Sequence, residues 1–284
     1  MNAATPSPAS SPRADIGVIG GSGFYEFLDV AERVRVETPF GAPSDDVVVG
    51  SVAGRRVAFI ARHGQGHRFP PHLVNYRANL WALRSLGVRQ VLAPCAVGSL
   101  RADYGPGTIV VPDQVVDRTW GRAHTVYDAV GPVVHVGFAD PYCPRGREVV
   151  TRTARESGKQ VVDTGTLVVV NGPRFSSRAE SRWHQEAGWS VVGMTAMPEA
   201  SLARELAMCF TTIALVTDHD AGVEGGEAVT HEEVLRVFAR NVGDLKQVLQ
   251  ATIGAMPEPE DDASASCACR RGLDGIPLPI ELPA

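Results

Sequence analysis

Short apolar runs rich in Val, Ile and Thr recur along the chain, separated by glycine, proline and polar residues. Runs of this length and composition are typical of buried strands. We predict strands over 16–19, 47–52, 56–60, 88–93, 109–111, 166–170 and 209–217.

Other segments place apolar residues three or four positions apart, which is the spacing of an amphipathic helix. A proline in a first turn and a capping box mark the starts of two of them. We expect helices around 76–83, over 199–206 after Pro198, and over 235–249 after Thr230 and Glu233. Strands that alternate with helices indicate an α/β domain.

The two ends of the chain differ in composition from the body. Residues 1–15 are rich in Ala, Ser and Pro and lack an apolar run, so we expect a disordered extension before a single folded body over 16–256. Residues 257–284 form a linker and tail whose final apolar residues are interleaved with proline and cannot form a helix. That last stretch either docks on the body or on a neighbouring subunit, or forms a disordered tail.

The charge balance excludes several classes of protein. There are 27 Lys and Arg against 32 Asp and Glu, a net charge of -5, and the basic residues are scattered, so a nucleic-acid or anionic-membrane surface is not expected. Lys159 and Lys246 are the only lysines, and no Gly-Lys-Ser/Thr motif occurs, which excludes P-loop chemistry. With no run of about 18 apolar residues, we expect a cytoplasmic protein that acts on a small molecule.

The five cysteines fall into two groups. Cys95, Cys143 and Cys209 lie in apolar segments and look like reduced core thiols, whereas Cys267 and Cys269 form a Cys-Ala-Cys motif in the tail. Without a second pair this motif is a weak zinc signal, and a local disulfide or no role fits it better. We therefore predict no metal site.

Small and polar residues follow several of the predicted strands. Residues 20–23, Gly-Gly-Ser-Gly, can place backbone amides and a hydroxyl around an oxyanion, although a tight turn explains them equally well. Glu26 in place of a third glycine disfavours a dinucleotide site. Arg62 and His63 follow a strand and offer donors to a phosphate, the plain alternative being a surface Arg-His pair.

Four further motifs each have a functional and a structural interpretation. Residues 94–99 form a second small-residue loop over an anion or a simple turn. Phe175, between two arginines, either stacks on a planar ligand or fills the core. Thr195 precedes a helix, where it binds an anion or caps the helix. Asp218 and Asp220, at a strand end, can hydrogen-bond to a heterocycle, and calcium fits poorly because the rest of an EF-hand loop is missing.

Taken in order, these motifs resemble the methylthioadenosine phosphorylase branch of the trimeric purine nucleoside phosphorylases. The resemblance runs from Ile16 to near Met256, and it includes Val-Asn-Tyr-Arg-Ala-Asn-Leu-Trp-Ala-Leu over 74–83, Gly-Pro-Arg-Phe-Ser-Ser-Arg-Ala-Glu-Ser over 172–181, Met-Thr-x-x-Pro-Glu and Thr-Asp-x-Asp. It implies a single-domain, three-layer α/β fold with a central mixed β-sheet flanked by helices. It also implies a homotrimer, no metal or organic cofactor, and inorganic phosphate as co-substrate.

The activity that the resemblance implies is reversible phosphorolysis of S-methyl-5′-thioadenosine to adenine and 5-methylthioribose 1-phosphate. The phosphate-binding positions would be Ser22, Arg62, His63, Cys95, Ala96 and Thr195. Met194 falls on the ribose contact and Phe175 on the substrate. Asp218 and Asp220 would meet adenine N7 and its exocyclic amine, with a protonated Asp218 as the general acid.

Departures from the family pattern concern the phosphate loop and the 5′ pocket. Cys95 replaces a usual threonine and offers a weaker hydrogen bond. His231 stands where many relatives have an apolar residue, beside Ser176 and near His67. A 5′-halo- or 5′-deoxyadenosine, or a broad range of purine nucleosides, therefore stays an alternative substrate. Asp218 favours a 6-aminopurine, because oxopurine phosphorylases tend to carry Asn there.

Two further expectations concern assembly and activity. The segment with His124, Thr125 and His135 can reach into a neighbouring subunit's site. From a different class of protein, a catalytically silent nucleoside-binding protein is the alternative, and replacing Asp218 distinguishes it from an enzyme.

Overall fold

The computed structural model describes residues 13–21, 29–223, 231–258, 260 and 265–283. The strands are β1 (Ile16–Gly20), β2 (Asp29–Val34), β3 (Val47–Val52), β4 (Arg55–Ala61), β5 (Gln90–Ser99), β6 (Ile109–Val110), β7 (Gln114–Arg118), β8 (Val161–Val162), β9 (Thr166–Val170), β10 (Val191–Gly193) and β11 (Cys209–His219). The helices are α1 (Tyr76–Ser85), α2 (Pro144–Glu156), α3 (Arg178–Glu186), α4 (Ala196–Glu205) and α5 (His231–Ala255).

The described strands form one mixed sheet with the main order β2-β3-β4-β1-β5-β10-β9-β7. β1 lies parallel between β4 and β5, and β11 runs parallel to β5. β10 is antiparallel to β5 and parallel to β9. The long strand β5 pairs with β1 at its start and with β10 at its end, so it joins the two halves of the sheet.

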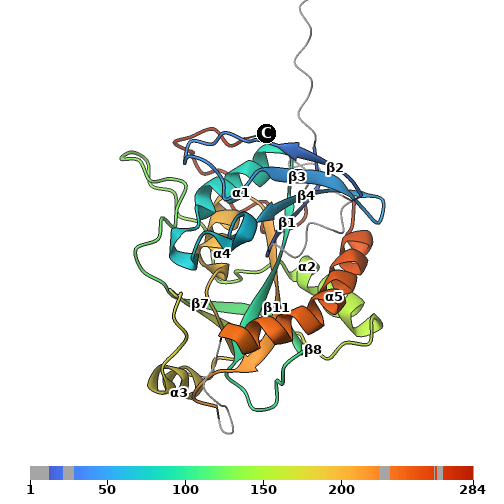
Figure 1. Cartoon of the computed structure of the whole chain (residues 1–284). Coiled ribbons are helices and arrows are strands. Elements are labelled where there is room, and N and C mark those ends of the chain that lie inside the picture. Colours follow the sequence, from blue (N-terminus) through green and yellow to red (C-terminus); the bar gives the residue numbers. More distant parts are fainter. Residues whose placement is uncertain (1–12, 22–28, 224–230, 259, 261–264, 284) are drawn as a thin grey trace, which may run out of the picture.

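Side chains alternate between the two faces of the sheet, so the described residues form two large hydrophobic cores, one on each face. Along β1, Ile16 and Val18 belong to the core that includes residues of α2 and α5, whereas Ile19 belongs to the core that includes residues of α1 and α4. Figure 1 shows the two helix pairs on opposite sides of the sheet. The expected three-layer α/β fold with a mixed central sheet is thus confirmed.

Each predicted strand and helix is present, but several elements were not predicted. β2, β7, β8 and β10 are edge or very short strands with little apolar signal. In α3 only Ser181 and His184 are buried, so no apolar stripe reveals the helix, although Ser177 and Glu180 form a capping box at its start.

The prediction of a loop or turn over residues 94–99 is wrong. Residues 94–99 form the second half of β5, because β11 continues to pair with β5 there and β10 replaces β1 on its other side. The small residues in this stretch therefore lie in a hydrogen-bonded strand. Thr230, expected to cap α5, lies outside the described residues.

The ends of the described chain are attached to the body. Ala14 is buried in the core with α1, and its amide donates to the Leu86 carbonyl at 2.9 Å, so packing starts before Ile16. In the tail, Ile280 and Leu282 pack against the same core, as the docking interpretation expects. Over the residues described, none of the helices has both the length and the apolar content to cross a membrane.

Candidate active site

Most of the predicted site residues follow, or lie late in, strands that end at one edge of the sheet. β1, β4, β5 and β11 are parallel, so their carboxyl ends meet there, which is where open α/β sheets bind ligands. β10 enters from the antiparallel side and places Val192 opposite Gly98 of β5. Because β10 is antiparallel to β5, residues 194 and 195, which follow β10, continue from Gly98 back toward Cys95 and Ala96.

Arg62 is the central cation of this edge. It follows β4, is 3% exposed, and contacts Glu199 of α4 through both nitrogens of one guanidinium edge, at 2.6 Å from Nε to Oε1 and 3.1 Å from Nη2 to Oε2. Its Nη1 and Nη2 also donate to the carbonyl oxygens of Pro94 and Ile19, at 3.1 and 2.9 Å. The side chain therefore ties the ends of β1 and β4 and the middle of β5 to α4.

The ion pair of Arg62 and Glu199 is fully desolvated, because Glu199 is 1% exposed. Burial alone would lower the pKa of Arg62, but Glu199 raises it above its ordinary value. Burial raises the pKa of Glu199, and Arg62 offsets part of that rise. A guanidinium has five N–H donors. The contacts with described residues use four of them and leave one on Nη1 for an anion such as phosphate.

His63 is held in a defined tautomer beside Arg62. Its Nδ1 lies 2.8 Å from the Phe69 carbonyl oxygen, which only accepts, so Nδ1 carries the proton and Nε2 is an acceptor in the neutral ring. Burial, then the neighbouring Arg62 charge, lowers the pKa of His63 to about 4. His67 stacks on this ring at 4.1 Å between centroids. A neutral His63 suits a protonated phosphate oxygen, which can donate to Nε2.

The other residues that we predicted to bind phosphate differ in how the structure places them. Cys95 lies in β5 next to Pro94, and burial raises the pKa of its thiol to about 12, so the sulfur stays protonated and can donate. Ala96 follows it and is exposed. Thr195 is buried at the start of α4 and does not cap the helix with its side chain, which favours the anion interpretation over the capping one. Ser22 lies outside the described residues.

Asp218 and Asp220 come together beside Gly98. A bulge in β11 between Val216 and Asp218 shifts the register, and a Cβ on Gly98 would lie 3.1 Å from Asp218 Oδ2 and 3.6 Å from Asp220 Cβ. Bulges of this kind re-aim side chains next to active sites. The Thr217 hydroxyl donates to Asp218 Oδ1 at 2.7 Å.

Asp220 has an unusual environment for a carboxylate. It is 3% exposed, and its Oδ2 has no hydrogen-bond partner among the described residues. An unsatisfied buried acceptor costs about 1–3 kcal/mol. This oxygen is therefore placed to accept a hydrogen bond from a bound ligand.

Met194 connects this edge to the loop that carries Phe175 and Ser176. A Cβ on Gly172 would lie 2.6 Å from Met194 Sδ, and Gly172 has φ +63°, so only glycine allows this close approach. Phe175 is half-buried and belongs to neither core. Ser176 lines a pocket with Asn171, Gly172 and Trp183, whereas the predicted phosphate residues do not line it. The side chain of His231 is not described.

Two charged residues of this region were missed by sequence reasoning. Glu199 is the partner of Arg62. It ends the Met-Thr-x-x-Pro-Glu motif, but α4 also carries Arg204 and Glu205, so no local pattern distinguishes it. Arg122 is buried and donates to the Tyr76 hydroxyl at 3.2 Å and to the Asn171 carbonyl at 2.9 Å. It comes from a long irregular segment, where no periodic pattern indicates that a side chain is buried.

The fold and this edge define a class of protein: an α/β enzyme with a candidate anion site and a pair of carboxylates at the carboxyl ends of its strands. The chain belongs to the phosphorylase superfamily, which it matches over residues 15–254. It is 58% identical to a purine nucleoside phosphorylase of Streptomyces coelicolor over 97% of this chain and 100% of that protein. It is 53% identical to an S-methyl-5′-thioadenosine phosphorylase of Mycolicibacterium smegmatis, over 94% and 99%.

Solved structures give the same result. A methylthioadenosine phosphorylase from an antarctic soil metagenomic library superposes with a TM-score of 0.85 at 39% identity, over 92% of this chain and 91% of that one. Methylthioadenosine phosphorylase from Schistosoma mansoni in complex with adenine gives a TM-score of 0.81 at 38% identity, over 85% and 91%. The chain is therefore a phosphorylase of the pentosyltransferase type.

Proposed function

We propose that the protein catalyses the reversible phosphorolysis of S-methyl-5′-thioadenosine to adenine and 5-methylthioribose 1-phosphate. The observation that carries the proposal is the buried Oδ2 of Asp220, which has no partner among the residues that the structure describes, beside Asp218 at the ligand-binding edge. An adenine offers a matching pair of groups. Its exocyclic amine donates to Asp220, and its N7 accepts the proton that Asp218 supplies as the general acid.

The anion half of the site supports phosphate as the attacking group. Arg62 supplies a fixed positive charge, neutral His63 supplies an acceptor, and Cys95 and Thr195 supply further donors. A phosphate held beneath the sugar stabilises the positive charge that develops at C1′ and then forms the new bond to that carbon. Met194 and Phe175 would contact the nucleoside. The proposed reaction requires no metal or organic cofactor.

We also propose that the enzyme is a cytoplasmic homotrimer. None of the five cysteines forms a disulfide in the structure, as is usual in a reducing compartment. The irregular segment over 119–143 exposes Trp120, Val130 and Val133, by 75%, 107% and 74%, and we propose that it contributes to the contact between subunits.

The residues expected to reach a neighbouring site lie in this same segment. His124 and His135 are exposed. The Thr125 hydroxyl instead donates to Glu205 of its own chain at 2.8 Å. We therefore keep only the two histidines as candidates for contact with a neighbour.

A broad purine nucleoside phosphorylase is the second candidate, because the Streptomyces relative at 58% identity carries that name. The 5′ pocket, with Ser176, His67 and His231 as candidate residues, sets the choice of 5′ substituent, whereas Asp218 and Asp220 set the choice of base. Comparing kcat/KM for 5′-methylthio-, 5′-halo-, 5′-deoxy- and unmodified adenosine, and for inosine, distinguishes them. A preference for inosine would refute the proposed substrate.

The reaction itself is tested by adenine release with and without phosphate. We expect release only with phosphate, and we expect Asp218→Asn to slow it by about 10²- to 10⁴-fold, the usual contribution of a general acid. Asp103→Asn is the matched control, because Asp103 is an exposed aspartate paired with Arg101 at the surface. Equal adenine release in phosphate-free buffer would show that the enzyme is a hydrolase. An unchanged rate in Asp218→Asn would show that Asp218 is not the general acid.

A further inference from the structure

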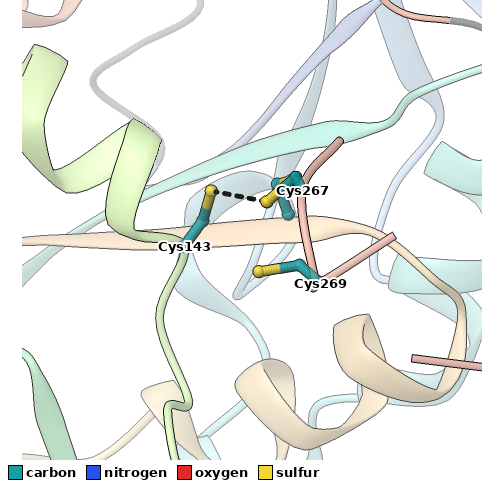
Figure 2. Close-up of side chains that lie close together, drawn as sticks. Cys143, Cys267 and Cys269 are labelled. Carbon is teal, nitrogen blue, oxygen red and sulfur yellow. Dashed lines mark hydrogen bonds between the residues drawn. The ribbon is translucent and has the colours of Figure 1, made fainter. Parts of the chain in front are cut away.

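Four of the five cysteines lie together in the fold, although they come from three segments that are far apart in the sequence. Cys143 precedes α2 and Cys209 begins β11, while the other two belong to the tail. Figure 2 shows the side chains of Cys143, Cys267 and Cys269 grouped together with their sulfurs close to one another. The tail motif that lacked a second pair in the sequence has one in the fold.

The spacing of the sulfurs matches a tetrahedral metal centre. The Sγ of Cys267 lies 3.7 Å from that of Cys143 and 3.5 Å from that of Cys209, and all four sulfurs lie within 4.8 Å of one another. Zinc–sulfur bonds of about 2.3 Å in a tetrahedron place the sulfurs roughly 3.8 Å apart. A single cation at the centre can therefore contact all four.

The composition of the cluster argues against simple core packing. All four cysteines are buried, and they form a cluster of their own among the described residues, without an aliphatic or aromatic member. A hydrophobic core built for packing mixes branched and aromatic side chains to fill its volume. Four buried thiols grouped in this way are instead the ligand set of a structural zinc site.

Nearby cations compensate the charge that such a site carries. A divalent cation with four thiolates has a net charge of −2. Arg204, which is 8% exposed, directs Nη2 at the Cys269 sulfur at 3.7 Å and also donates to the Gly137 and Asp140 carbonyls. Donors in this position orient metal ligands and stabilise their charge.

The adjoining cavity is also rich in arginine. Cys143, Cys209 and Cys267 line it, together with Arg89, Arg145 and Arg270. Acidic side chains line it as well, and one of them, Glu260, pairs with Arg145 at 2.9 Å. The cavity gives a cation a route to the sulfurs.

We propose that these four cysteines bind one thiophilic divalent cation of the zinc type. Binding displaces the four thiol protons, and no electron transfer is involved. The site is closed, because the protein supplies all four ligands, so its role is structural. Cys209 and Asp218 lie nine residues apart along β11, or roughly 30 Å at about 3.3 Å per residue. The cation fastens the tail to the body at a distance from the candidate active site.

The direct test is the metal content of the full chain, purified without an affinity tag and under reducing conditions. We expect about one zinc per chain in the wild type and in Cys95→Ser, whose cysteine lies outside the cluster. We expect Cys267→Ser and Cys269→Ser to lose most of the metal. Loading with Co²⁺ should give the visible bands of a tetrahedral cobalt thiolate in the first two proteins only.

A second measurement does not depend on the folding of any variant. Titrating wild-type protein with an organic mercurial should release zinc in step with modification of the thiols, and the melting temperature should fall as the metal leaves. Two results would overturn the proposal. One is reduced wild-type protein that retains no metal after incubation with Zn²⁺. The other is that protein isolated from cells contains no metal and its four cysteines react with an alkylating agent only after reduction, because the cysteines would then be disulfide-bonded.

Discussion

Replacing Glu199 with glutamine removes the negative charge that faces Arg62 while keeping the shape of the side chain. Arg62 and Glu199 are 3% and 1% exposed, so the guanidinium would remain buried without a counter-charge. Breaking a buried ion pair by removing one partner costs about 3–5 kcal/mol, a large part of a typical total stability of about 5–15 kcal/mol. At roughly 2–4 °C per kcal/mol, the melting temperature should fall by about 6–20 °C.

The same change should weaken phosphate binding, because Glu199 fixes the direction of the guanidinium. Loss of one charge-assisted hydrogen bond, about 1.5–3 kcal/mol, corresponds to a rise in the KM for phosphate of roughly tenfold or more. The KM for the nucleoside should change far less. Differential scanning fluorimetry and initial rates at varied phosphate concentration measure the two effects.

Glu205→Gln is the matched control, since Glu205 is also a buried glutamate of α4. Its carboxylate accepts from the Thr125 hydroxyl and the Val126 amide, both neutral donors. We expect a smaller fall in melting temperature and an unchanged KM for phosphate. A Glu199→Gln enzyme with wild-type melting temperature and wild-type KM for phosphate would refute the role assigned to the ion pair.

Two further predictions concern pH and packing. Because the pKa of His63 is lowered to about 4 from an ordinary value of 6.5, the unfolded chain binds more protons between these values, so stability is complete above about pH 6.5 and falls as the pH drops toward 4. The loss of free energy of unfolding from this group is at most about 3 kcal/mol. In denaturant unfolding, the free energy of unfolding of His63→Gln should depend less steeply on pH than that of the wild type. Identical slopes would contradict the lowered pKa of His63. A Cβ on Gly17 would lie 2.9 Å from Val88 Cγ1, so Gly17→Ala should destabilise by about 1–3 kcal/mol. Gly243→Ala in α5 is the control, because its Cβ would have no atom within 4 Å, and it should be neutral or stabilise the protein by up to about 1 kcal/mol. Equal effects of the two changes on stability would show that the close contact at Gly17 does not destabilise the variant.

The sequence by itself determined the main elements of the fold and the order of the motifs. The apolar runs that became β1, β3, β4, β9 and β11 are buried in the sheet, and burial of a strand requires local apolar residues that a single segment displays. The positions of Arg62, His63 and Asp218 at or just after strand ends followed from the same pattern, whereas Thr195 was predicted only as a residue that precedes a helix. Parallel strands then bring those positions to one edge.

Only the tertiary structure decided which distant groups meet. The pairing of Arg62 with Glu199 spans 137 positions, and that of Cys143 with Cys267 spans 124. Neither has a local signal, because such contacts depend on how helices and tail pack on the sheet. The second half of β5 became a strand for a similar reason: partner strands supplied its hydrogen bonds, which no property of residues 94–99 specifies. A local pattern of apolar residues predicts which side chains of a segment are buried, whereas the packed fold determines which residues they contact.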